Sequence, residues 1–79
     1  MMTRKLFQVR FRFSPDSLTW LVVHEQLVLS RHCRKRDAVT EAARVARANP
    51  PSALVIERMD GTVERERRYG VRTGVDATL

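Results

Sequence analysis

The chain has 79 residues, a formal net charge of +6, and a composition that is 43% hydrophobic and 30% charged. This length allows one small core, and the single cysteine, Cys33, excludes an internal disulfide. The longest apolar stretch, residues 18–23, is far shorter than the roughly 20 residues that cross a bilayer. We therefore expect a single cytoplasmic domain with no membrane segment.

The excess of positive charge lies in the first part of the chain. Residues 1–36 contain eight basic and two acidic side chains, whereas residues 37–79 contain seven of each. Such an asymmetry favours an anionic partner. Nearly all of the basic residues are arginine, however, and a codon-usage bias would produce the same excess without any binding function. Both interpretations are open at this point.

Three strands are predicted before the first helix. Residues 5–13 alternate between polar and apolar side chains, with the apolar ones on one face of the strand (Phe7, Val9, Phe11 and Phe13). A turn at residues 14–17 leads into residues 18–24, which are apolar on both faces and therefore typical of a central strand. Residues 27–30 predict a third, short strand of the same meander.

The helix is predicted over residues 36–48. Its apolar residues fall on one face at helical spacing, and most of them are alanine, so the helix axis can lie close to the sheet. We expect this face to cover the side of the sheet that carries Phe7, Val9, Phe11 and Trp20. Asn49-Pro50-Pro51 ends the helix, because proline lacks an amide donor and disfavours helix in the preceding residue.

A β-hairpin follows the helix. Residues 53–59 form an apolar strand, Asp60-Gly61 is a strong turn signal, and residues 62–69 return as a highly charged strand that suits a sheet edge. Residues 71–79 show no periodicity, which predicts a disordered tail after a domain at residues 1–70.

The elements together predict an α+β fold of ββ(β)αββ order. We expect a single antiparallel sheet with one helix packed on one face. One helix cannot cover both faces, so Leu21 and Val23 should be exposed on the other. An exposed apolar face of this kind favours a protein interface, including one between two copies of the chain.

Several of these residues, in this order, resemble a known family. Trp20 and Val22, the helix at residues 38–46, Leu54-Val55-Ile56, Asp60-Gly61 and Tyr69-Gly70 are similar to the small bacterial family of domains of unknown function numbered 2188. The resemblance covers residues 5–70. It implies a compact ββαββ-like fold, and it implies no activity, catalytic residue or ligand.

A basic cluster precedes the helix and is the strongest candidate site. It contains Arg31, Arg34, Lys35 and Arg36, at a helix start where free amides and guanidinium groups both favour an anion. A solvated loop, balanced in part by Asp37, would have the same sequence. Arg10 and Arg12 point away from the predicted core and would extend the anion-binding surface.

The aromatic residues weaken the case for nucleic acid. Phe7, Phe11, Phe13 and Trp20 are expected in the core, where they cannot stack on bases. Any contact with nucleic acid would therefore be made mainly to the backbone.

The soft metal ligands form no paired motif. They are His24, His32 and Cys33, and a closed zinc site normally needs four ligands. His32 and Cys33 are adjacent, which on a strand makes their side chains diverge and argues against a catalytic pair. We therefore expect no metal, no cofactor and no enzyme activity.

The leading hypothesis is a binding module for nucleic acid or another polyanion, and the alternative is a protein-interaction or homodimerising module.

Overall fold

The computed structural model describes residues 4–70, and the predicted tail at residues 71–79 lies outside this range. Each predicted element is present. The elements in chain order are β1 (Lys5–Ser14), β2 (Ser17–His24), β3 (Leu27–His32), α1 (Lys35–Ala48), β4 (Ser52–Glu57) and β5 (Val63–Tyr69).

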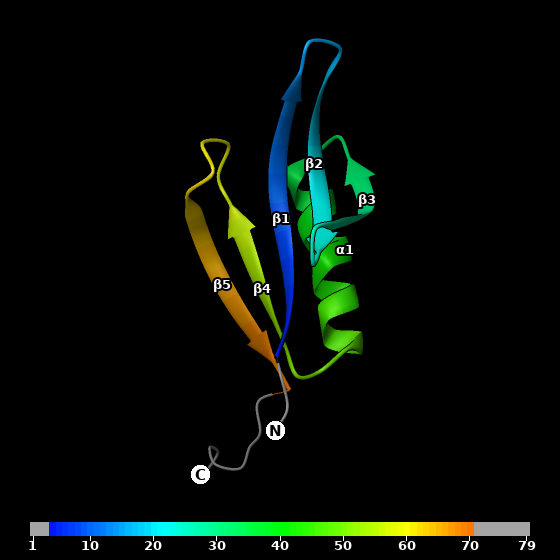
Figure 1. The fold of residues 1–79 in the computed structure, drawn as a ribbon, viewed down its shortest axis with the longest axis vertical. Coiled ribbons are helices and arrows are strands. Elements are labelled where there is room, and N and C mark those ends of the chain that lie inside the picture. Colours follow the sequence, from blue (N-terminus) through cyan, green and yellow to red (C-terminus); the bar gives the residue numbers. More distant parts are fainter. Residues whose placement is uncertain (1–3, 71–79) are drawn as a thin grey trace.

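The strands form one five-stranded sheet in the order β3-β2-β1-β4-β5 (Figure 1). Neighbouring strands are antiparallel except for β1 and β4, which pair in parallel from Lys5 opposite Ser52 to Val9 opposite Ile56. The α+β class is confirmed, but the prediction of a wholly antiparallel sheet is wrong at this pair. The reason is that α1 runs back along the sheet after β3, so that β4 starts at the same end as β1.

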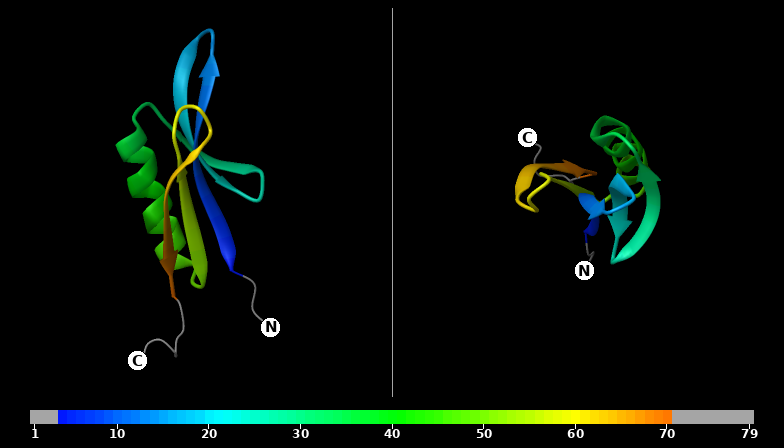
Figure 2. Two further views of the ribbon diagram at one scale, coloured as in Figure 1. Left: turned by 90° about the vertical axis from the view of Figure 1, so that its left-hand side faces the viewer. Right: turned by 90° about the horizontal axis from the view of Figure 1, so that it is seen from above.

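The helix covers one face of the sheet, as predicted (Figure 2). Its buried positions are all alanine: Ala38, Ala42, Ala43 and Ala46. It ends at Ala48, just before Pro50 and Pro51, and the hydroxyl of the buried Ser52 donates a hydrogen bond of 2.6 Å to the carbonyl oxygen of Ala46. The Asn49 amide also donates to this carbonyl, at 3.1 Å, so the two groups replace the amide that Pro50 lacks.

The core lies between α1 and the three central strands. The strands contribute alternate residues, which point to the same face of the sheet. Those that are buried against the alanine face are Phe7, Val9, Trp20, Val22, Leu54 and Ile56. Phe11 is only partly buried and packs against this cluster, with its ring centroid 4.9 Å from that of Trp20.

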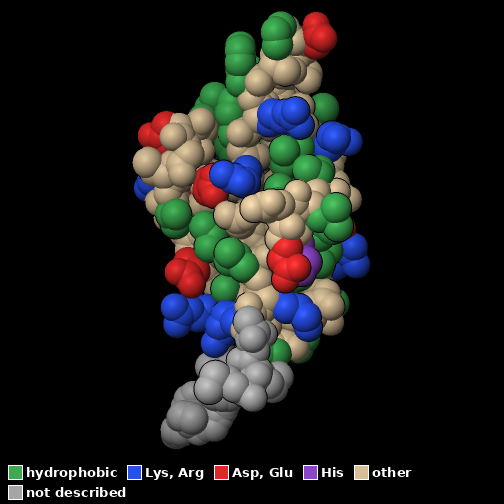
Figure 3. Space-filling view, in the orientation of Figure 1, with side chains coloured by type: hydrophobic (Ala, Val, Ile, Leu, Met, Phe, Trp, Pro, Cys, Tyr) green, Lys and Arg blue, Asp and Glu red, His purple; other side chains and the backbone are tan. Residues whose placement is uncertain are grey.

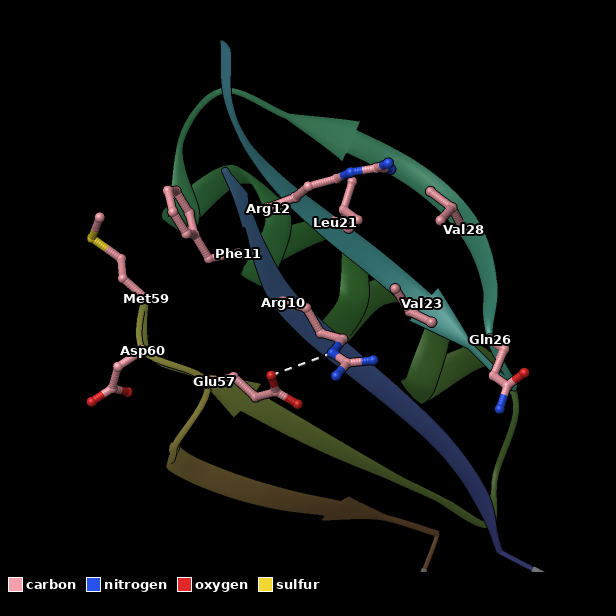
Figure 4. A pocket seen from close by; sticks show the side chains of 11 residues that line it. Arg10, Phe11, Arg12, Leu21, Val23, Gln26, Val28, Glu57, Met59 and Asp60 are labelled. Atoms are coloured by element: carbon pink, nitrogen blue, oxygen red, sulfur yellow. Dashed lines mark hydrogen bonds and ion pairs between the residues drawn. The ribbon is translucent and has the colours of Figure 1, made fainter. Parts of the chain in front are cut away.

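The other face of the sheet differs from the prediction at Leu21 and Val23. We expected both to be exposed, but they are only 8% and 4% exposed. They lie at the bottom of a hollow of about 480 Å³ whose other lining residues include Arg10, Arg12 and Val28 (Figure 4). On this face Leu21 lies between its cross-strand neighbours Arg10 and Arg31, and Val23 lies between Gln8 and Val28, so side chains of the adjoining strands shield both.

Phe13 also differs from the prediction. Its side chain is 73% exposed rather than part of the core, and its cross-strand partner Leu18 is 54% exposed. The β1–β4 pairing stops at Val9, so the rest of β1 pairs only with β2 as a projecting hairpin (Figure 2). Phe13 lies beyond the point where α1 covers the sheet.

Candidate anion-binding surfaces

The six basic residues singled out in the sequence do not form one surface. Arg10 and Arg12 on β1 and Arg31 on β3 line hollows on the face of the sheet that α1 leaves uncovered. Lys35 and Arg36, in the first turn of α1, lie on the opposite side in a separate groove. Arg34 is the residue before the helix and lines neither of these surfaces.

Arg10 is held by a carboxylate. Its Nε lies 3.3 Å from Oε1 of Glu57, which is only 8% exposed, and the Gln8 amide donates to the other carboxylate oxygen at 3.5 Å. The dashed line in Figure 4 marks the Arg10–Glu57 pair. Because the charge of Arg10 is matched by that of a fixed, nearly buried Glu57, Arg10 is a poor candidate for binding an external anion.

Arg12 and Arg31 share a small hollow of about 230 Å³. Three hydroxyl-bearing residues complete its polar lining, namely Ser14, Ser17 and Thr19. On the same face of the molecule, basic side chains are dispersed among acidic and hydrophobic ones (Figure 3). This face therefore carries a small hollow with two basic side chains rather than a continuous basic surface.

The strongest concentration of positive charge lies between α1 and β5. Here a groove of about 440 Å³ opens over Ile56, because α1 packs on β1 to β4 and leaves β5 uncovered. We call it the helix groove; its lining residues are Lys35, Arg36, Val39, Thr40, Ile56, Glu64, Arg65 and Arg67. Four of them are basic and one is acidic, so the groove has an excess of positive charge.

Lys35 and Glu64 form an ion pair at one end of the helix groove. The hydrogen bond from the Lys35 ammonium is the main reason that the pKa of Glu64 lies below its ordinary value, and the charges of Lys35, Arg58 and Arg65 lower it further. The Lys35 Nζ also lies 5.4 Å from the centroid of the Trp20 ring, within cation–π range. Lys35 is thus fixed by two contacts.

The three arginines of the helix groove are more available than Lys35. Arg36, Arg65 and Arg67 form no ion pair with any carboxylate of residues 4–70. They come from two elements that are distant in sequence, and their guanidinium groups suit the oxygens of a phosphate. The helix groove can therefore accept an anion without first breaking a salt bridge at these three positions.

The sequence did not identify Arg65 and Arg67 as site residues. Both share a face of β5 with Tyr69: Arg65 pairs with Ile56, and Tyr69 packs against the core. The available signal was therefore the alternation that places both arginines on the helix side of the sheet. The missing information was that β5 lies next to the first turns of α1.

The predicted helix start carries no side-chain cap. Arg34 has extended backbone angles of −120° and 141°, and its side chain makes no capping hydrogen bond. Asp37 supplies the only acidic side chain of the first turn, while Lys35 and Arg36 are cations that oppose the helix dipole. This unfavourable local charge would be relieved by an anion in the helix groove.

The two histidines and the cysteine are not brought together. His24 Nδ1 lies 2.8 Å from the carbonyl oxygen of Leu6, and His32 Nε2 lies 2.9 Å from the hydroxyl of Ser30. Cys33 is free and exposed. Within residues 4–70 no three His, Cys, Asp or Glu side chains are grouped so that they could hold a metal ion.

The helix is also unsuited to a membrane. At 14 residues, α1 is shorter than a bilayer-spanning helix, and in the described part of the chain no helix is both long and apolar enough to cross.

These features define a class of small α+β domain: a mixed five-stranded sheet, one alanine-lined helix on one face, and a basic groove beside that helix. A family model described as an uncharacterised protein conserved in bacteria, domain of unknown function 2188, matches residues 11–69, which is more than half of the chain. The chain belongs to this family, and the expected resemblance is confirmed. Comparisons with curated proteins and with solved structures found no match.

Proposed function

We propose that this protein is a non-enzymatic binding module of the cytoplasm that contacts nucleic acid, or a similar polyanion, through the helix groove. The observation that carries the proposal is the gathering of Lys35, Arg36, Arg65 and Arg67 around one hollow that contains a single carboxylate, Glu64. Phosphate groups are the natural ligands for such a set of cations. This revises the surface expected from the sequence, since only Lys35 and Arg36 belong to both.

Electrostatic binding of this kind predicts a steep dependence on salt. Each phosphate that a basic side chain neutralises contributes about −0.7 to the slope of log K against log salt for a single strand, and about −0.9 for duplex DNA. If Arg36, Arg65 and Arg67 each contact one phosphate, replacing all three by glutamine should make the slope shallower by about 2 for a single strand or about 3 for a duplex.

The test is fluorescence anisotropy with labelled single-stranded and duplex oligonucleotides between about 50 and 200 mM salt. The matched control replaces Arg4, Arg44 and Arg47 by glutamine, because all three are exposed and lie outside the helix groove, and because their replacement removes the same charge. We expect a large loss of affinity for the groove variant and a small one for the control. Equal losses, or no binding of the unmodified protein at the lowest salt, would remove the proposal.

A second candidate function, self-association, is favoured by one specific observation. The surface predicted for it, Leu21 and Val23, is buried within the chain. The edge strand β3 instead exposes Leu27, Val28 and Leu29 by 64%, 36% and 42%, and an apolar edge strand can pair with another copy.

Light scattering during size-exclusion chromatography tests this candidate. A dimer that dissociates when Leu29 is replaced by lysine supports pairing through β3. A monomer at high protein concentration excludes it.

A further inference from the structure

The projecting β1–β2 hairpin exposes an aromatic ring that the packing of the domain does not use. Phe13 is 73% exposed, and exposing an aromatic side chain forgoes much of the stabilisation that its burial would give. The neighbouring Leu18 is 54% exposed, so the two side chains form an apolar pair on the hairpin. An exposed ring in this position is available to contact a ligand.

Phe13 lies on the same side of the sheet as the helix groove. Alternation along β1 places Phe11 and Phe13 on the helix side, and Phe11 packs against Trp20 at 4.9 Å. Lys35, which lines the helix groove, lies 5.4 Å from that Trp20 ring. Phe13 is two residue pairs further along the hairpin, about 7 Å beyond Phe11. Phe11 and Trp20 therefore lie between the exposed ring and the end of the groove that holds Lys35.

A ring beside a basic groove is the arrangement that binds single-stranded nucleic acid, because the groove takes the phosphates and the ring stacks on a base. We propose that this protein binds single-stranded DNA or RNA, with phosphates at Arg36, Arg65 and Arg67 and one base stacked on Phe13. The inference rests on the proposed function of the helix groove and specifies its ligand. A paired base could not reach Phe13, since its faces are already stacked within the duplex.

The hairpin is a poorer match to a duplex. A two-stranded ribbon can enter the major groove of DNA, but here its turn carries the exposed Asp16, which phosphates would repel. Arg10, on the same hairpin, is already paired with Glu57. Arg12, the other basic residue of the hairpin, lines a hollow on the opposite face, whereas the helix groove brings three unpaired arginines together on the helix side, where they can follow a flexible single strand.

The experiment compares Phe13→Ala and Phe13→Trp with the unmodified chain, using a labelled single-stranded oligonucleotide and the duplex of the same sequence between about 50 and 200 mM salt. Losing one base–aromatic stack should weaken single-strand binding about 5- to 150-fold in Phe13→Ala. Phe13→Trp should retain the affinity, because it keeps a flat aromatic face. Neither variant removes a charge, so the salt slope should stay the same. Circular dichroism checks that both variants are folded.

The outcomes separate this inference from the proposed function. If Phe13→Ala binds the single strand as tightly as the unmodified chain while the arginine variant does not, the helix groove binds phosphates and stacking on Phe13 is wrong. Tighter binding to the duplex, or equal losses in Phe13→Ala and Phe13→Trp, would also overturn the stacking. If the unmodified chain binds neither oligonucleotide, the proposed function and the inference both fail.

Discussion

The alanine face of α1 provides the most direct test of the fold, through the substitution Ala42→Leu. Ala42 is completely buried between α1 and the sheet, and it belongs to the same core as Leu54. A leucine there must push the helix away from the strands or adopt a strained conformation. Overpacking of a well-packed core typically costs about 1–3 kcal/mol.

This cost is large for so short a chain. A domain of this length is expected to have a free energy of unfolding of about 4–12 kcal/mol. At about 4–8 °C per kcal/mol, the melting temperature of Ala42→Leu should fall by about 4–24 °C. The control is Ala48→Leu, the same change at an exposed position of the same helix, which should alter stability by less than about 0.5 kcal/mol.

Urea unfolding, followed by the fluorescence of the only tryptophan, measures both variants. Trp20 is 8% exposed and lies in the core against which the helix packs, so its emission should report the loss of that packing. Equal midpoints for Ala42→Leu and Ala48→Leu would show that the alanine face is not closely packed. The account of how this helix covers the sheet would then be wrong.

Two further predictions concern the β4–β5 hairpin. Gly70→Ala should lower the melting temperature more than Gly61→Ala, although both glycines have positive φ angles, of 68° and 89°. The reason is that a Cβ added at Gly70 would clash with the Cβ of Pro50, whereas one added at Gly61 meets nothing within 4 Å. Thermal melts that place Gly61→Ala lower would contradict this contact. The Asp60 carboxylate accepts hydrogen bonds from the hydroxyl and the amide of Thr62, at 2.7 and 2.9 Å, and these bonds lower the pKa of Asp60. A lowered folded-state pKa stabilises the protein above the ordinary pKa, and this effect is lost as the pH falls. The unmodified chain should therefore be more stable than Asp60→Asn at pH 7, and the difference should shrink as the pH falls below the ordinary Asp pKa of about 3.9. A difference that grows in acid would refute the linkage.

The local elements could be predicted from the sequence because each has its own signal. The helical spacing from Ala38 to Ala46, the stop at Pro50 and Pro51, and the turn at Asp60-Gly61 all act within a few residues. The structure contains these elements at nearly the expected bounds. The burial of Trp20 against the helix followed from the same patterns.

The parallel pairing of β1 and β4 had no such local signal. An alternating strand such as β1 has the same pattern whichever way its neighbour runs, so the direction depends on the path of the chain through α1. The same limit explains Phe13. The alternation of Phe11 and Phe13 continues past Val9, the last residue of β1 that pairs with β4. Nothing in the sequence shows that the helix no longer covers the sheet at Phe13.

The candidate site was predicted only in part, for two physical reasons. Leu21 was expected to be exposed because only the helix was considered as cover, whereas its cross-strand neighbours Arg10 and Arg31 have aliphatic stems that shield it on the other face. The helix groove combines Arg36 from α1 with Arg65 and Arg67 from β5, and only the three-dimensional fold brings these distant segments together.

The parallel pair β1–β4 has a consequence for how the protein acquires its binding surface. It joins the three-stranded meander at the start of the chain to the β4–β5 hairpin near its end, and it therefore closes the longest loop in the molecule. Arg36 lies in α1, which follows the meander, and Arg67 lies in the β4–β5 hairpin. In a nascent or partly opened chain, the arginines of α1 and of β5 would not lie beside each other. The complete helix groove would therefore be present only after β1 and β4 have paired.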